Sequence, residues 1–262
     1  MNLLDYSAIV INISGGKDSQ TIMGVVMAEV KKQAYSGDVL AIHADTKAEW
    51  PQSLPHCQLL CEHYRLQLIV AEPFRPLPEH IERRCIMMAA QQPRGKPGWP
   101  SPAQRYCTSD CKRAPIEKAV RASFPAKLGK SILTVTGERR QESAHRAKLS
   151  EVEPDKTLTA GYRSVTKWRP ILDYTEEHVW SHIRATGIPR HIAYDLGNKR
   201  LSCAMCIMAC EQDIRNGANA RPDLAEMFLR IERETGFSFM HKKSLETILS
   251  RGGDHADMGK NF

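Results

Sequence analysis

The sequence predicts an α/β protein: a doubly wound, mostly parallel sheet with a helical C-terminal appendage. Short apolar runs rich in β-branched residues alternate with longer helical stretches in the first part of the chain, which is typical of a parallel sheet covered on both faces. A hydrophobic content of 42% in 262 residues supports a sizeable core. After residue 173 the pattern changes to helices and short loops. We therefore expect an α/β domain over residues 1–173 and a helical region over 174–262.

Each element follows from a local signal. Apolar runs that end at glycine or a polar residue predict strands over residues 8–13, 39–44, 66–71 and 131–136. Longer stretches without helix breakers predict helices over residues 17–34, 51–65 and 223–235. Thr175 is expected to cap a further helix, since threonine accepts backbone hydrogen bonds there. Residues 75–105 are rich in proline and glycine and are expected to form a loop, and residues 251–262 a frayed tail.

Composition restricts the class of protein. No run approaches the roughly 18 apolar residues that a membrane span needs, and the N-terminus lacks a basic stretch followed by an apolar one. These features predict a cytoplasmic protein without a membrane partner. The net charge is +7, and residues 94–146 hold 12 Lys/Arg against 4 Asp/Glu. Such an excess favours a polyanion, either nucleotide phosphates or a nucleic acid, over a merely solvated surface.

The strongest functional signal lies between the first predicted strand and the first predicted helix. It consists of Ser14, Gly15, Gly16, Lys17, Asp18 and Ser19. Two glycines allow a tight turn that exposes backbone N–H groups, and the helix N-terminus adds the positive end of its dipole. The lysine and the serine hydroxyls complete a cradle for phosphate. The spacing differs from that of G-x-x-x-x-G-K-[ST] and from that of G-x-G-x-x-G.

Two further motifs follow predicted strands. Asp45 comes directly after the second strand, where it could orient a nucleotide or a metal ion; a plain turn is the alternative. Gly137 comes after the fourth strand and begins a segment with Arg139 and Arg146, whose guanidinium groups can bind phosphate or sulfate oxygens in a bidentate manner. Glu142 is expected to hold one of these arginines. The alternative for this segment is a salt-bridged helix start.

In this order, the motifs resemble those of the PP-loop ATP pyrophosphatases and their relatives, the phosphoadenosine phosphosulfate (PAPS) reductases. SGGKDS is similar to the phosphate loop of that family, residues 137–146 look like its G-x-R-x-x-E-S-x-x-R element, and residues 167–174 resemble its R-P-I-x-D-W segment. The resemblance implies a Rossmann-like domain that binds ATP, or PAPS or adenylylsulfate (APS), together with Mg²⁺. It assigns catalytic roles to Lys17, Asp45 and Arg139.

The chain has eight cysteines, and short spacings in a chain without export signals favour metal or thiol chemistry over disulfides. Cluster-bearing relatives, including APS reductases and the ATP pyrophosphatase of DNA phosphorothioation systems, combine an upstream cysteine region with a downstream C-x₂-C. That likeness implies a [4Fe–4S] site at Cys107, Cys111, Cys203 and Cys206, with Cys210 as a substitute ligand. The upstream cysteines are adjacent in the reductases and separated here. Zinc and buried free thiols are the alternatives.

The remaining cysteines carry less information. Cys57 and Cys61 are one helical turn apart and are expected to pack in the core, and Cys85 has no predicted role. In the reductases a nucleophilic thiol lies in a C-terminal Glu-Cys-Gly-Leu-His segment. Nothing similar follows Cys210 in this sequence, which puts reduction by the usual thiol route in doubt.

Three functions remain open on this sequence. The first is an ATP pyrophosphatase that activates a substrate oxygen for sulfur insertion, nearest to DNA phosphorothioation and alternatively RNA thiolation, with a cysteine desulfurase or another sulfur donor as partner. The second is a PAPS or APS reductase that uses a displaced thiol such as Cys210. The third is a catalytically quiet partner protein that binds nucleic acid.

Overall fold

The computed structural model describes residues 1–91, 96–240 and 242–250, so the predicted frayed tail lies outside the described residues. The chain forms two compact units. The first unit comprises Met1–Asp45, Gln52–Glu72 and Lys112–Ile192. The second unit comprises Thr46–Pro51, Pro73–Cys111 and Ala193–Phe262. This division differs from a single boundary after residue 173, because two N-terminal segments cluster with the C-terminal helices.

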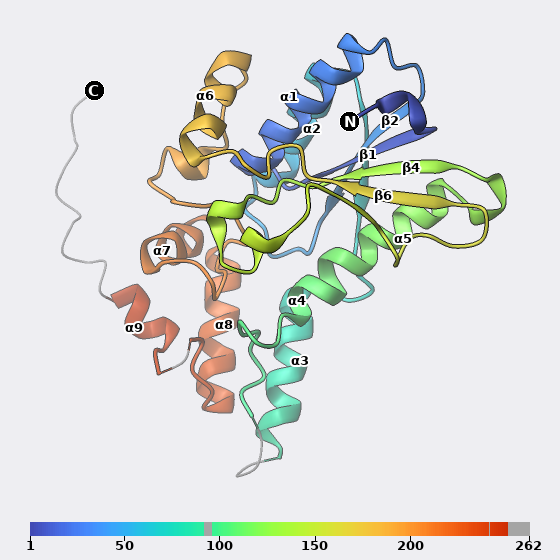
Figure 1. Ribbon diagram of the computed structural model, residues 1–262. Coiled ribbons are helices and arrows are strands. Elements are labelled where there is room, and N and C mark those ends of the chain that lie inside the picture. Colours follow the sequence, from blue (N-terminus) through green and yellow to red (C-terminus); the bar gives the residue numbers. More distant parts are fainter. Residues whose placement is uncertain (92–95, 241, 251–262) are drawn as a thin grey trace. The chain divides into compact units, whose positions relative to one another are not determined.

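A six-stranded sheet forms the centre of the first unit, in the order β3-β2-β1-β4-β6-β5. Figure 1 labels β1, β2, β4 and β6 of this sheet. Its strands are β1 (Ala8–Ile13), β2 (Asp38–Ala44), β3 (Gln67–Ala71), β4 (Ser131–Val135), β5 (Val152–Pro154) and β6 (Ser164–Trp168). All neighbouring pairs are parallel except β5 with β6, which is antiparallel. The predicted mostly parallel α/β fold is confirmed, and β5 and β6 are strands that the sequence analysis did not predict.

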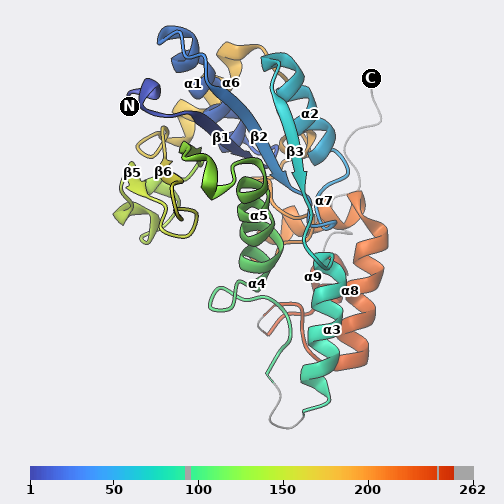
Figure 2. The same cartoon turned by 90° about the vertical axis from the view of Figure 1, so that its right-hand side faces the viewer.

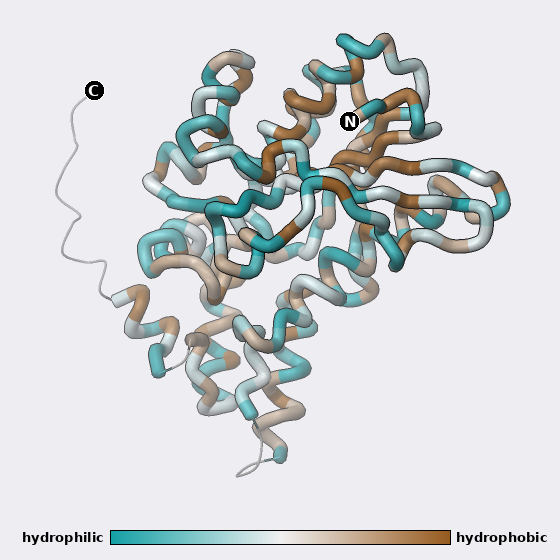
Figure 3. The backbone as a smooth tube through the Cα atoms, viewed as in Figure 1, coloured by the Kyte–Doolittle hydropathy of each residue, from teal (hydrophilic) through white to brown (hydrophobic). Residues whose placement is uncertain are grey.

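Helices cover both faces of this sheet. They are α1 (Lys17–Lys32), α2 (Ser53–Tyr64), α5 (Ala114–Ser123) and α6 (Glu176–Thr186). Alternate residues of β1 point to opposite faces. Ile9 and Ile11 belong to the cluster that contains apolar side chains of α1, α2 and α6, whereas Ala8 and Val10 belong to the cluster that contains those of α5. The apolar strands of this doubly wound core show clearly in Figure 3.

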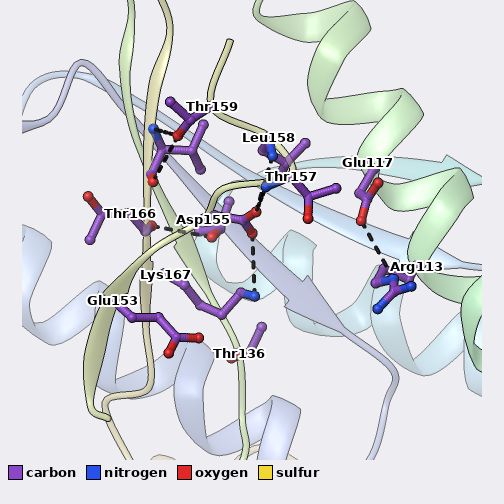
Figure 4. Close-up of polar contacts among 12 residues, drawn as sticks. Arg113, Glu117, Thr136, Glu153, Asp155, Thr157, Leu158, Thr159, Thr166 and Lys167 are labelled. Atoms are coloured by element: carbon purple, nitrogen blue, oxygen red, sulfur yellow. Dashed lines mark hydrogen bonds and ion pairs between the residues drawn. The ribbon is translucent and has the colours of Figure 1, made fainter. Parts of the chain in front are cut away.

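The connection from β5 to β6 is fixed by one carboxylate (Figure 4). Asp155 Oδ1 accepts hydrogen bonds from the backbone N–H groups of Thr157 and Leu158, at 3.0 and 3.1 Å. Its other oxygen lies 3.4 Å from Lys167 Nζ on β6. Because Asp155 is buried, this pairing satisfies its charge and holds the edge of the sheet in register.

The second unit is helical (Figure 2). Its helices are α3 (Leu77–Ala89), α4 (Tyr106–Thr108), α7 (Glu211–Ala220), α8 (Pro222–Thr235) and α9 (Leu245–Ser250), and a π-helical turn at Ser109–Arg113 leads into the first unit. Helix α8 packs against α3, α7 and α9. The Trp99 ring meets those of Phe228 and Phe239 edge to face, each at 5.2 Å between centroids. The Trp99 Nε1–H donates to the Phe237 carbonyl at 2.9 Å.

Helix α3 corrects the sequence analysis, in which residues 75–105 were expected to be a loop. Pro76 is the N-cap residue of α3 and Pro78 lies in its first turn, where proline costs no helical hydrogen bond. Leu77, Ile81 and Cys85 are buried at a spacing of four residues, so one face of the helix packs in the core of the second unit. Residues 92–95 of the same stretch lie outside the described residues.

Within the described ranges, no helix combines the length and the hydrophobicity that a membrane crossing demands.

Candidate functional site

The turn after β1 has the conformation that a phosphate cradle needs. Gly15 adopts a φ of +76°, in the left-handed region that favours glycine. A Cβ at this position would lie 3.2 Å from the Ser53 carbonyl oxygen, so α2 also restricts the space. Helix α1 starts at Lys17 with Gly16 as its N-cap. Because glycine has no side chain, it cannot cap the first backbone N–H groups of the helix. An anion suits this helix end.

Ser19 holds the turn together from inside. Its hydroxyl donates to the Gly16 carbonyl at 2.8 Å and accepts from the Ser14 backbone N–H at 3.2 Å. The side chain is buried, with 7% of its surface exposed. Of the two predicted hydroxyl donors, Ser19 therefore shapes the loop, whereas the exposed Ser14 lies at its open side.

The loop sits where the strand order of the sheet reverses. β2 and β3 lie on one side of β1, and β4 and β6 on the other. In open α/β sheets, ligands bind at the carboxyl ends of the strands next to such a point. Gly137, just after β4, approaches α1 so closely that a Cβ there would lie 3.1 Å from the carbonyl carbon and oxygen of Asp18. The structure thus brings the two motifs together, one after β1 and one after β4.

Lys17 is held inside the first unit. Its side chain is 7% exposed, and its Nζ lies 3.5 Å from Glu176 Oε1 at the start of α6. The same ammonium lies 5.9 Å from the centre of the Trp180 ring. Neither α6 residue was predicted as a site residue. The available signal was their position directly after the segment 167–174, in a helix start capped by Thr175.

Arg139 and Asp18 form a largely buried ion pair. Arg139 Nε donates to Asp18 Oδ1 at 2.6 Å, and the side chains are 4% and 23% exposed. Burial raises the pKa of Asp18 above its ordinary value, and the charges of Arg139 and Lys17 oppose that rise. The guanidinium of Arg139 is therefore already paired with Asp18 and stabilises the start of α1.

Gln141 joins this pair to α6. Its Oε1 accepts from Arg139 Nη1 at 3.0 Å and from the backbone N–H of Glu176 at 2.9 Å. The Lys17–Glu176 contact completes a ring of interactions that starts and ends in the first turn of α1. The glycine turn of residues 14–19, the segment after β4 and the start of α6 therefore form one connected polar network.

The rest of the 137–146 segment is also ion-paired. Glu142 contacts Arg146, and its Oε2 accepts from the Arg139 backbone N–H at 2.8 Å. Glu138 Oε2 lies 2.5 Å from Arg169 Nε. Burial opposes the ionisation of Glu138, but the hydrogen bond and charge of Arg169 outweigh it and lower its pKa. Glu142 thus contacts both predicted anion-binding arginines.

Asp45 follows β2 at the same edge of the sheet. Its backbone N–H donates to the Ala71 carbonyl at 3.0 Å, which continues the pairing with β3, and its side chain is partly exposed. Next to the glycine turn, His43 Nδ1 lies 3.1 Å from the Ile13 carbonyl oxygen and 3.6 Å from Cys57 Sγ. The neighbouring His56 is also buried, and burial lowers its pKa.

The predicted metal ligands all belong to the second unit. Cys111 is buried at 1% exposure, Cys107, Cys203 and Cys206 are partly buried against the same hydrophobic cluster, and Cys210 is exposed at the N-cap of α7. All eight cysteines are free thiols.

Acidic and imidazole groups lie beside two of these thiols. Cys203 Sγ lies 3.7 Å from Glu49 Oε1, whose carboxylate also accepts from the Thr46 backbone N–H at 2.9 Å. Cys111 Sγ lies 3.9 Å from His80 Nδ1.

Residues 198–210, which we call the cysteine loop, are fastened to α7. Asp213 Oδ1 accepts from the Lys199 backbone N–H at 3.0 Å. Asn216 Nδ2 donates to Asn198 Oδ1 at 2.8 Å. Gly217 lets the loop lie directly on the helix, because a Cβ there would lie 1.6 Å from the Ala204 carbonyl oxygen. The position of the loop is therefore set by protein contacts.

The donor types suit a soft metal ion or an iron–sulfur cluster, since thiolates are its preferred ligands. In the described ranges, however, no three His, Cys, Asp or Glu side chains are arranged to hold a metal ion. The four predicted ligands share a hydrophobic cluster without reaching coordination geometry. The three cysteines outside the predicted ligand set, Cys57, Cys61 and Cys85, are buried. Burial raises the pKa of Cys61 to about 11 and that of Cys85 to about 12.

Much of the basic segment carries ion pairs in the first unit. Glu117 pairs with both Arg113 and Arg121, as Figure 4 shows for the first. Lys130 lies 3.5 Å from Asp38, and Arg140 lies 2.7 Å from Asp173. These pairs partly neutralise the positive charge of the basic segment.

Comparisons with known proteins identify the family of this chain. The phosphoadenosine phosphosulfate reductase domain matches residues 8–209. An uncharacterised protein of Methanocaldococcus jannaschii is 25% identical over 230 residues, which are 88% of this chain and 49% of that protein. The APS reductase of Neisseria meningitidis serogroup A is 34% identical over 117 residues, 44% of this chain and 43% of the reductase. The chain spans about half the length of the curated relatives it matches, or less.

A solved structure supports the fold. A variant of FMN adenylyltransferase from Candida glabrata superposes with a TM-score of 0.50 at 13% identity, covering 77% of this chain and 55% of that one. A likeness at this identity concerns the fold alone. The matched family region contains the whole sheet, the glycine turn, the segment after β4 and most of the cysteine loop. On this evidence the chain belongs to the phosphoadenosine phosphosulfate reductase domain family.

Proposed function

We propose that this protein is an ATP pyrophosphatase that activates a substrate oxygen for sulfur insertion. The observation that carries the proposal is the juxtaposition at the strand-order reversal: the glycine turn after β1, the buried Lys17 and the segment that begins at Gly137. Backbone N–H groups of the turn would bind the phosphates, and Lys17 would stabilise the charge that develops on them. Asp45, at the same edge, is the residue proposed to hold Mg²⁺, which would neutralise the leaving pyrophosphate.

The proposed reaction has two steps. A substrate oxygen attacks the α-phosphorus of ATP, the bond from that phosphorus to the bridging oxygen breaks, and pyrophosphate leaves with the electron pair. A hydrosulfide-level sulfur nucleophile, supplied by a donor such as a cysteine desulfurase, then attacks the activated centre, and AMP leaves with the original oxygen. The polar network around Lys17 and Arg139 orients the phosphates during the first step.

The cysteines of the second unit are proposed to serve the sulfur step. Cys107, Cys111, Cys203 and Cys206 would hold a [4Fe–4S] cluster, or zinc in its place, with Cys210 as the substitute ligand. A nucleic acid is the proposed acceptor, as in DNA phosphorothioation or RNA thiolation, and the net charge of +7 supports a polyanionic partner.

The test measures products. Purified protein is incubated with ATP and Mg²⁺, with and without duplex DNA or tRNA, and pyrophosphate and AMP are quantified. We expect acceptor-dependent pyrophosphate release that Lys17→Ala abolishes. Lys32→Ala, at the exposed other end of α1, is the matched control and should retain it. Absence of pyrophosphate release with every acceptor would refute the proposal, and salt-sensitive nucleic-acid binding in that case would indicate a non-catalytic partner protein.

One observation favours a second candidate, a sulfonucleotide reductase: the 34% identity to an APS reductase over 44% of the chain. The exposed Cys210 is then the thiol. Its sulfur attacks the sulfate sulfur of APS or PAPS, the adenosine phosphate leaves with the bridging oxygen, and a reduced dithiol donor releases sulfite from the resulting S-sulfocysteine. Sulfite release from APS or PAPS with dithiothreitol, lost in Cys210→Ser, would support this candidate over the first.

A further inference from the structure

Lys17 has an anionic partner of the protein's own. Its Nζ lies 3.5 Å from Glu176 Oε1, and the two side chains differ strongly in exposure, at 7% and 52%. The buried lysine is held in place, whereas the half-exposed carboxylate can turn into water. An incoming phosphate would compete with this carboxylate for the same ammonium group.

The backbone at Glu176 is anchored separately from its side chain. The Glu176 N–H donates to Gln141 Oε1 at 2.9 Å, and Thr175 caps the helix by accepting from the His178 N–H at 3.2 Å. Helix α6 also packs along α1, where His182 lies against Gly24. Release of Lys17 therefore requires a side-chain rotation of Glu176 and leaves the helix in position.

Trp180, one turn further along α6, has two cations near its ring. Lys17 Nζ is 5.9 Å and Arg190 Cζ is 5.6 Å from the centre of its ring. A change in the ionic partner of Lys17 alters the field at the indole, so Trp180 provides an optical signal of that change.

We propose that Glu176 is a resident counterion of the phosphate-site lysine, which the phosphates of the nucleotide displace when they bind. The inference rests on the proposed binding of nucleotide phosphates at Lys17 and adds a residue that tunes the affinity. Removing the charge of Glu176 removes a competitor, so nucleotide binding tightens. Because the exchange takes place at Lys17, the gain depends on that residue.

The test is calorimetry with ATP and with inorganic pyrophosphate, both without Mg²⁺, on wild-type protein, Glu176→Gln and Glu177→Gln. Glu177 is the matched control, since it is exposed on the same helical turn and loses the same charge. We expect Glu176→Gln to bind both ligands about three- to tenfold more tightly, and Glu177→Gln to stay within about twofold of wild type. In a Lys17→Met background, Glu176→Gln should change affinity less than twofold.

A second readout follows the exchange directly. Titration with pyrophosphate should change the tryptophan fluorescence of wild-type protein, and Trp180→Phe should lose most of that change. Weaker or unchanged binding in Glu176→Gln, or an equal gain in Glu177→Gln, would overturn the inference while leaving phosphate binding intact. If wild-type protein binds neither ligand, the proposed function itself fails, which is a separate result.

Discussion

Replacing Arg139 by methionine tests whether this arginine stabilises the fold around the candidate site. The change keeps a long apolar side chain but removes the donors to Asp18 Oδ1, Gln141 Oε1 and the Tyr174 carbonyl, at 2.6, 3.0 and 3.5 Å. Removing one partner of a fully buried ion pair costs about 3–5 kcal/mol. The side chain of Asp18 is 23% exposed, so water reduces that cost, and we expect a loss of about 2–3 kcal/mol in the free energy of unfolding.

Arg121→Met is the matched control. Arg121 also forms an ion pair, at 3.0 Å from Glu117, but its side chain is 44% exposed, and Glu117 keeps Arg113 as a second partner. Exposed pairs of this kind contribute about 1 kcal/mol or less. Urea unfolding without nucleotide should therefore separate two substitutions that remove ion pairs of similar length.

The pH dependence supplies a second check. Burial raises the pKa of Asp18 above 3.8, and the loss of Arg139 raises it further. A folded state with a raised carboxyl pKa holds the proton more tightly than the unfolded chain does, so stability falls as pH rises from 3.8 through the folded pKa. The deficit of Arg139→Met relative to wild type should thus grow as the pH rises above 3.8.

Adding Asp18→Asn should remove the part of that deficit that changes with pH. The supporting role of Arg139 is refuted if Arg139→Met unfolds like Arg121→Met, or if its deficit does not change with pH.

Three further predictions concern other parts of the chain. Gly217→Ala should lower the unfolding temperature, although alanine favours a helix by about 1 kcal/mol, because its Cβ would lie 1.6 Å from the Ala204 carbonyl oxygen; a higher temperature would contradict the seating of the cysteine loop. Thr175→Ala should cost about 1 kcal/mol in urea unfolding through loss of the helix cap, and unchanged stability would exclude that role. Cys111→Ala should abolish the metal content of anaerobically purified protein and any absorbance at about 400 nm, whereas Cys61→Ala keeps both; equal metal content would remove Cys111 from the ligand set.

Local sequence patterns predicted most of the fold. The β-branched run Ala8–Ile13 predicted β1, and its burial on both faces confirms the parallel-sheet interpretation. Helix α3 was missed because Pro76 and Pro78 resemble helix breakers, although proline is tolerated in a first turn. Strand β6 has a mixed composition, and its pairing with β4 depends on the tertiary fold more than on its own pattern.

The site was predictable only as a set of motifs. The glycine turn and the segment after β4 were located from sequence, and the topology explains why they meet. The choice of partners was not accessible, since Arg139 and Asp18 are 121 positions apart and either could have faced a ligand. The contact of Lys17 with Glu176 spans a comparable separation. The motif assignments to catalysis and metal binding stay predictions.

The second unit is assembled from three separated stretches of chain, and this has a consequence for biosynthesis. Residues 73–111 carry Cys107 and Cys111 and emerge from the ribosome long before the α8 side chains that pack with Trp99. Domains generally fold as units during synthesis. Until α7 and α8 are translated, these upstream thiols therefore lack the hydrophobic cluster that encloses them in the folded second unit.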